Sequence, residues 1–153
     1  MLRISRLTDY GTVVLAHLAS DDAFRVSAAD VATGTGVALP TVSKLLKTLA
    51  KAKIVISTRG AYGGYQLARD ARAISAADII DALEGPVSIT ECSSTNSHCD
   101  LEAVCTVGGA WQRINVAIRR ALDEVSLADL LRTNSQMPRL HFAGMPINVE
   151  QKR

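Results

Sequence analysis

All three cysteines of this 153-residue chain lie in one short segment, at Cys92, Cys99 and Cys105. Six residues separate the first two cysteines and five separate the last two. The segment is rich in Ser, Thr and Asn, which predicts a polar loop. Because thiolates bind metals and also undergo redox reactions, we expect the chemistry of the chain to lie in this loop.

The cysteine spacing leaves several kinds of site open. Inert cysteines are usually buried among apolar residues, whereas these three lie in a polar segment. A thiol–disulfide switch needs only two neighbouring thiols and a lowered thiol pKa. Zinc sites usually contain a C-x2-C pair, which this chain lacks. The wider gaps suit a larger group that thiolates hold, such as an iron–sulfur cluster.

Composition sets limits on the rest of the molecule. A mass of 16.3 kDa and a hydrophobic fraction of 48% predict one modest domain, and an aromatic fraction of 4% requires an aliphatic core. No apolar run approaches the roughly 18 residues of a membrane span, and residues 1–11 lack the apolar part of a signal peptide. We therefore expect a cytoplasmic protein with reduced thiols and no membrane partner.

The positive charge of the chain is concentrated in one stretch. Between Asp30 and Asp70 there is no acidic residue. The basic residues of that stretch are Lys44, Lys47, Lys51, Lys53, Arg59 and Arg69. A block of +6 in a chain with a net charge of +2 predicts a surface that binds a polyanion.

The first half of the chain has the pattern of a helix-turn-helix. Apolar spacing predicts helices over 7–19, 27–33 and 39–52, and the glycines of 34–36 end the second helix. Two β-like runs follow, joined by the glycine-rich RGAYGG, which predicts a hairpin with Arg59 at the start of its loop. A hairpin directly after a basic helix is typical of the wing of a winged-helix protein.

The second half predicts a helix over 75–84, the cysteine loop, and a long helix over 109–125. Apolar residues recur along the long helix at spacings of 3, 4, 3 and 4, as in a coiled coil. These residues are Trp111, Ile114, Ile118, Ala121 and Val125. The stripe predicts a homodimer, although a single helix can also pack such a stripe on its own domain.

The fold class that follows is mainly α-helical with a small β-hairpin wing. We divide the chain into a winged helix-turn-helix domain over 1–85, a cysteine loop over 86–108, a dimerisation helix over 109–133 and a mobile tail over 134–153. A last capped helical turn is expected at 126–131.

The sequence resembles the iron–sulfur winged-helix transcription regulators of the IscR/NsrR-like family over about residues 1–133. Four pieces carry the resemblance: RLTDYGTVVLAHLA, VSAADVATGTGVALPTVSKLLKTLAK, STRGAYGGYQLARD, and the three-cysteine loop with the long helix at Trp111. The opening and the cysteine spacing look most like the branch that regulates SUF-system iron–sulfur assembly.

The resemblance implies a homodimer that binds one cluster per subunit, [2Fe–2S] in many members and [4Fe–4S] in some, through Cys92, Cys99 and Cys105. Members similar to IscR place a histidine three residues after the last cysteine, where this chain has Gly108. Members similar to NsrR use an acidic residue of the partner's first helix, which matches Asp9 here. His98 is the rival fourth ligand.

The resemblance also assigns DNA contacts. Members of the family read base edges from the start of the third helix, and the matching residues here are Pro40, Thr41, Ser43 and Lys44. The basic face of that helix predicts Lys47 as a phosphate contact or a solubilising charge. The position of Arg59 in the wing, together with the resemblance, predicts that it enters the minor groove. Members similar to IscR carry Glu where this chain has Ser43, which changes the expected operator preference.

These observations predict a dimeric DNA-binding regulator, a repressor, that senses iron–sulfur cluster status and controls iron–sulfur assembly genes. The alternatives are a repressor of stress genes that senses nitric oxide or thiol redox state, and an iron–sulfur assembly interaction protein that does not bind DNA. An enzyme with a small-molecule substrate is not expected, because no catalytic triad, carboxylate pair or phosphate-binding glycine loop stands out.

Overall fold

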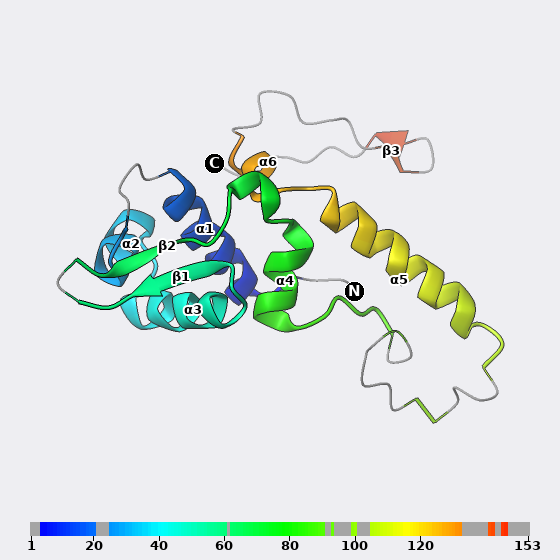
Figure 1. Ribbon diagram of the computed structural model, residues 1–153. Coiled ribbons are helices and arrows are strands. Elements are labelled where there is room, and N and C mark those ends of the chain that lie inside the picture. The colour runs from blue at the N-terminus through cyan, green and yellow to red at the C-terminus, as the bar shows by residue number, and fades with distance from the viewer. Residues whose placement is uncertain are drawn as a thin grey trace.

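The computed structural model of the chain is mainly helical with a small antiparallel hairpin (Figure 1), which confirms the predicted fold class. It describes residues 4–20, 25–60, 62–90, 93, 99–100, 105–132, 141–142 and 145–146. No helix among these residues is long and apolar enough to cross a membrane.

Three helices form the N-terminal unit: α1 (Arg6–Ser20), α2 (Ala28–Thr35) and α3 (Leu39–Lys51). The Ser27 side chain accepts a hydrogen bond from the Asp30 amide and caps α2. The sequence predicted the end of this helix at residue 33, but it continues to Thr35. Gly36 then ends it in the left-handed conformation, with φ of 71°.

The predicted wing is a hairpin of β1 (Val55–Thr58) and β2 (Gly64–Leu67). Val26, which precedes α2, adds to its edge: the Val26 amide donates to the Tyr65 carbonyl at 3.0 Å, and the Tyr65 amide donates to the Val26 carbonyl at 2.8 Å. A Cβ on Gly64 would lie 2.9 Å from the Val26 carbonyl oxygen, so glycine is required for this close approach.

The core is aliphatic, as the composition predicted. It is built by α1, α2, α3 and α4 (Ala76–Glu84), with the short 3-10 turn η1 (Ala71–Ala73) preceding α4. Its largest fully buried side chains are Leu15, Leu45, Leu46, Leu49, Ile74, Ile79 and Leu127. Burial of aliphatic side chains of this size is the main stabilising contribution to the fold.

Glu84, the last residue of α4, connects that helix to the start of α1. Its carboxylate accepts hydrogen bonds from the Ser5 amide, at 3.0 Å, and from the Thr8 hydroxyl. The Thr8 hydroxyl, followed by the Ser5 amide, holds the pKa of the Glu84 carboxyl below its ordinary value. The charged carboxylate therefore ties the two helix ends together at neutral pH.

The segment predicted as one long helix with a final turn consists of α5 (Gly108–Asp123) and α6 (Leu127–Leu131). Ser126 caps α6, and its neighbours pair with the residues that precede α4: the Ala76 amide donates to Val125 at 2.8 Å and the Leu127 amide donates to Ile74 at 2.7 Å. Thus α5 extends away from the winged domain and α6 returns to it (Figure 1).

Most of the tail predicted over 134–153 lies outside the described residues. Within it, β3 (His141–Phe142) pairs with β4 (Met145–Pro146) in an antiparallel arrangement.

Leu127 tests whether α6 belongs to the folded core, because its side chain is fully buried among core residues. Leu127→Ala should lower the free energy of unfolding by about 2–5 kcal/mol, measured by chemical denaturation at one protein concentration. Val116→Ala on α5, where the side chain is 48% exposed, is the control and should change it by no more than about 0.5 kcal/mol. Equal effects of the two substitutions would contradict this placement of α6.

Candidate nucleic-acid interface and cysteine loop

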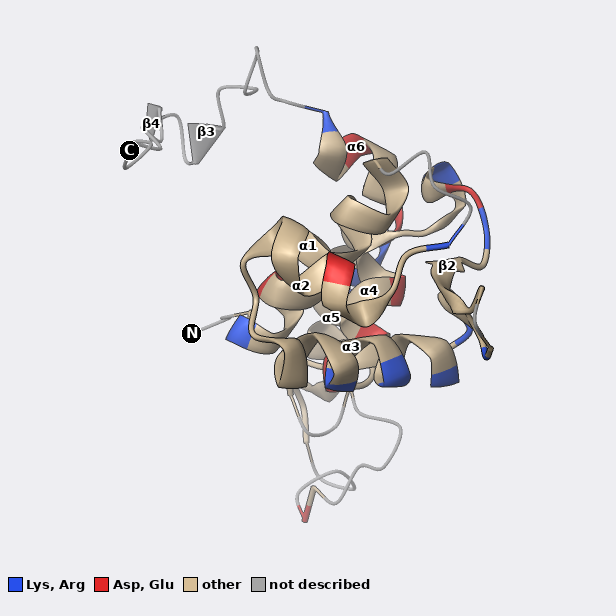
Figure 2. Cartoon of the chain, turned by 90° about the vertical axis from the view of Figure 1, so that its left-hand side faces the viewer, with Lys and Arg blue, Asp and Glu red and all other residues tan. Residues whose placement is uncertain are grey.

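The exposed face of α3 is basic. Lys44, Lys47 and Lys51 are exposed and recur at helical spacing, opposite the buried stripe that contains Leu45 and Leu49. Figure 2 shows these blue positions in a row along α3 with no acidic residue among them. Such a face suits contact with phosphates.

The wing brings another cation to this face. Arg59 is exposed at the end of β1, and it lines the same hollow as Lys47, together with Ser57 and Tyr65. A Cβ on Gly63 would lie 2.4 Å from the Thr58 carbonyl oxygen, so the tight loop requires glycine there. Two cations from separate elements therefore converge between helix and wing.

The other predicted DNA contacts lie at the start of α3. Pro40 is exposed and shares the basic face, whereas Thr41 and Ser43 are half-buried. The structure thus places all six predicted residues on α3 or at the base of the wing loop. Their roles in DNA binding remain predictions.

Arg69 does not contribute to the basic surface, although the sequence included it in the charged block. Its guanidinium pairs with Asp78 at 2.6 Å and donates to the Ala73 carbonyl at 2.7 Å. Asp78 lies on α4 and is also part of the capping box of that helix. Arg69 therefore holds the wing strand to α4.

Among the predicted cluster ligands, Cys92 and the rival His98 lie outside the described residues. Cys99 is half-buried, and Cys105 is exposed just before α5. A Cβ on Gly108 would lie 3.6 Å from the Cys105 sulfur, and a Cβ on Gly109 would meet nothing within 4 Å. A Cβ at either glycine would therefore be tolerated, and the exposed Cys105 thiol is the type of ligand that iron–sulfur clusters take.

Among the described residues, no three His, Cys, Asp or Glu side chains form a group that could hold a metal ion. Since Cys92 is not among those residues, the three-cysteine prediction stays a prediction.

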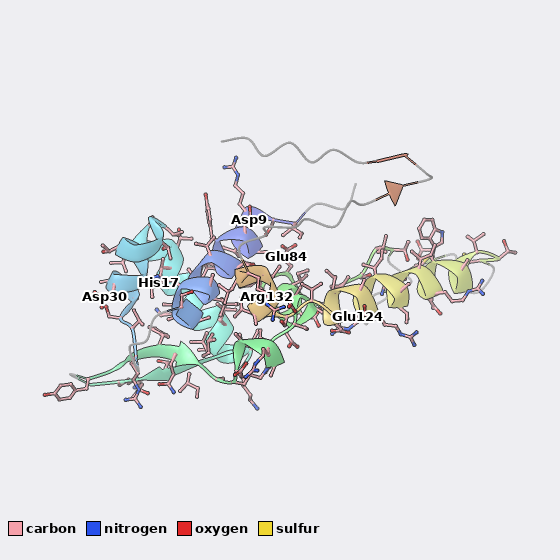
Figure 3. All side chains as sticks on the ribbon, turned by 90° about the horizontal axis from the view of Figure 1, so that it is seen from above. Asp9, His17, Asp30, Glu84, Glu124 and Arg132 are labelled. Atoms are coloured by element: carbon pink, nitrogen blue, oxygen red, sulfur yellow. The ribbon has the colours of Figure 1, made fainter. Side chains whose placement is uncertain are left out.

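Asp9 lies at the other end of α5 from Cys105. Asp9 is exposed on α1, where Figure 3 labels it. It lines a hollow with Leu122 and Val125. A helix the length of α5 spans about 24 Å, so Asp9 and Cys105 of one chain cannot bind the same cluster. His17, also on α1, packs its ring against Gly34, where a Cβ would lie 2.3 Å from the ring.

Sequence reasoning missed one set of polar residues beside the cysteine loop. Asn115 and Arg119 of α5 bond to the segment that follows α4 and to Asp81 of α4. Apolar spacing, the signal that located α5, carries no information about these contacts.

Three helices, a hairpin and a basic recognition face together define a winged-helix DNA-binding protein. The chain matches the family described as Rrf2, iron-dependent transcriptional regulator, over residues 4–133, and it belongs to that family. It is 35% identical over 139 residues to Protein rrf2 of Nitratidesulfovibrio vulgaris, which covers 90% of this chain and 93% of that protein.

Solved structures agree with this placement. CymR, the global cysteine regulator of B. subtilis, is 32% identical with a TM-score of 0.65, covering 86% of this chain and 97% of CymR. T. potens IscR is 31% identical with a TM-score of 0.64, covering 90% of this chain and 93% of IscR. The chain is therefore a DNA-binding transcription regulator and not an enzyme, in a family of typically dimeric proteins. Membership of this family argues against the alternative of an iron–sulfur assembly interaction protein that does not bind DNA.

Arg59 provides a test of the wing as a DNA contact. Arg59→Ala should weaken binding to the chain's own promoter DNA by about 1–3 kcal/mol, measured as a dissociation constant at fixed salt. Arg72→Ala is the control, because Arg72 pairs with Asp70 and does not line the hollow that Arg59 and Lys47 share. Equal dissociation constants for Arg59→Ala and the wild-type protein would contradict the assignment.

Proposed function

We propose that this regulator binds an iron–sulfur cluster through Cys92, Cys99 and Cys105 and changes its DNA affinity with cluster status. The observation that carries the proposal is the position of the cysteine loop between α4, a core helix of the DNA-binding domain, and α5. A cluster supplies a redox-sensitive and labile group that holds the thiolates together. We propose [2Fe–2S], with [4Fe–4S] as the alternative.

The exposed apolar stripe of α5 supports a homodimer. Trp111 is 42% exposed, Ile114 is 44% exposed and Val125 is 37% exposed, although each belongs to the predicted coiled-coil seam. Ile118 of the same seam is half-buried and lines a hollow with Ile80 of α4. The stripe therefore packs partly on its own domain, and its exposed remainder is the surface we assign to a second copy.

The geometry of α5 supports a fourth ligand from the second subunit. Cys105 lies before the first turn of α5, and Asp9 lies beside its last turn. Antiparallel pairing of two α5 helices would bring the partner's Asp9 to the end that carries Cys105. An oxygen ligand would make the cluster more labile than four thiolates would, which suits a sensor.

By resemblance, the regulated genes are those of iron–sulfur assembly, including the SUF system, and the regulator is a repressor. The exposed Cys105 thiol also favours a second candidate, a repressor that senses nitric oxide or thiol oxidation directly.

The proposed function predicts that cluster status sets DNA affinity. Dissociation constants for the chain's own promoter, measured anaerobically at one salt concentration, should differ about 5- to 150-fold between cluster-loaded and cluster-free protein. Cluster-free protein treated with a thiol oxidant distinguishes the two candidates. Only the second candidate predicts that the DNA dissociation constant changes on oxidation in the absence of iron. Identical constants in all three states would contradict both candidates.

The dimer can be tested with two neighbouring residues of α5. Ile114→Asp would bury an unpaired charge, which should weaken the dimer by about 3 kcal/mol or more, on the order of a hundredfold in dissociation constant. Val116 is 48% exposed on the opposite face, so Val116→Asp should leave the dimer intact. Sedimentation over a concentration series measures both variants. A dimeric Ile114→Asp protein would refute the assigned surface.

A further inference from the structure

The side chain of Asn115 forms a two-point bracket on the segment that leads from α4 into the cysteine loop. Its Nδ2 donates to the Val87 carbonyl at 3.2 Å, and its Oδ1 accepts from the Ile89 amide at 3.2 Å. One primary amide thus pairs with residues i and i+2, as a neighbouring strand would. Asparagine is a weak helix former, so its presence in the middle of α5 has no local explanation.

The opposite side of this segment is held by α4. Asp81 accepts a hydrogen bond from the Val87 amide at 3.1 Å and another from Arg119 at 3.0 Å. Arg119 also pairs with the second carboxylate oxygen of Asp81 at 2.6 Å. Both groups are partly shielded, with Arg119 39% exposed and Asp81 28% exposed. The segment is therefore hydrogen-bonded to α4 on one side and to α5 on the other.

This bracket holds the leading end of the cysteine loop, at Val87 and Ile89, against α5. Cys92 follows Ile89 by three residues, and Cys105 precedes Gly108, the first residue of α5. Asn115 lies seven residues into that helix, about 10 Å along its axis. Helix α5 is therefore connected to both ends of the loop. The two hydrogen bonds of Asn115 fix the position of residues 87 and 89 along this helix.

The same contacts continue into the DNA-binding domain. Asp81 and Glu84 are one turn apart on α4, and Glu84 bonds to the start of α1 through Ser5 and Thr8. Helix α4 also packs against α3, which carries the basic face. Hydrogen-bonded and packed groups therefore connect the leading segment with the elements predicted to contact DNA, and a shift of the segment would act through them.

We propose that Asn115 is a positioning residue for the cysteine loop, and that its bracket on Val87 and Ile89 couples the loop to α4 and to DNA affinity. The inference rests on the proposed function, since it names the contact through which cluster status acts. It assigns Asn115 no direct contact with the cluster or with DNA.

The test compares Asn115→Leu with Gln112→Leu. Leucine has the same branching at Cγ and the same number of side-chain heavy atoms as asparagine, and it removes both hydrogen bonds. Gln112 is an exposed amide one turn earlier on the same helix. Amide hydrogen exchange of the cluster-free protein is the first readout. The Ile89 amide should exchange faster in Asn115→Leu than in the wild-type protein, and at the wild-type rate in Gln112→Leu.

The second readout is the ratio of promoter dissociation constants for cluster-loaded and cluster-free protein. Asn115→Leu should bind DNA in both states with a ratio near one, whereas Gln112→Leu should keep the wild-type ratio. If Asn115→Leu does not fold, Asn115→Ala replaces it, because alanine also removes both hydrogen bonds and is a good helix former. The same outcomes then apply.

Three results would overturn the inference. An unchanged ratio in the Asn115 variant, with a ratio different from one in the wild-type protein, refutes the coupling and leaves the proposed function standing. Unchanged exchange of the Ile89 amide refutes the bracket itself. A wild-type ratio of one refutes the proposed function, and the inference with it.

Discussion

The structure depends on the return of the chain to the winged domain at Val125–Leu127. Two backbone hydrogen bonds, from Ala76 to Val125 and from Leu127 to Ile74, pair this stretch with the residues before α4, and the Leu127 side chain completes the core. As a result, the chain between α4 and α6 leaves the winged domain and returns to the same domain. The cysteine loop and α5 are therefore held to the DNA-binding unit at both ends.

This constraint separates the functions of the molecule in space. The basic face of α3 and the wing lie on one side of α4, and α5 extends from the other (Figure 1). The side chains of α5 differ in their contacts. Asn115 bonds to Val87 and Arg119 to Asp81 of α4, whereas Trp111 and Ile114 are exposed. Directional polar contacts hold residues 87 and 89 beside α4 and α5, and an apolar surface of α5 stays exposed.

Local signals in the sequence were sufficient to predict the winged domain. Ser27 and Ser75 mark helix starts because their hydroxyls accept backbone hydrogen bonds, and the glycines of the wing are needed where backbones approach closely. Long-range contacts were not predictable in this way. The pairing of Arg69 with Asp78, the bracket of Asn115 on Val87 and the burial of Leu127 each join residues through the fold, and no periodicity records them. The break between α5 and α6 was anticipated only by the cap at Ser126.

The central claim, that the three cysteines hold an iron–sulfur cluster, is tested most directly by the composition of the protein itself. Iron and acid-labile sulfide should be counted per chain in anaerobically purified, untagged protein, together with the visible absorption spectrum. The account predicts equal amounts of iron and sulfide with visible absorption bands, and their number per chain separates a two-iron from a four-iron cluster. A colourless protein that acquires neither iron nor sulfide on anaerobic reconstitution would contradict it.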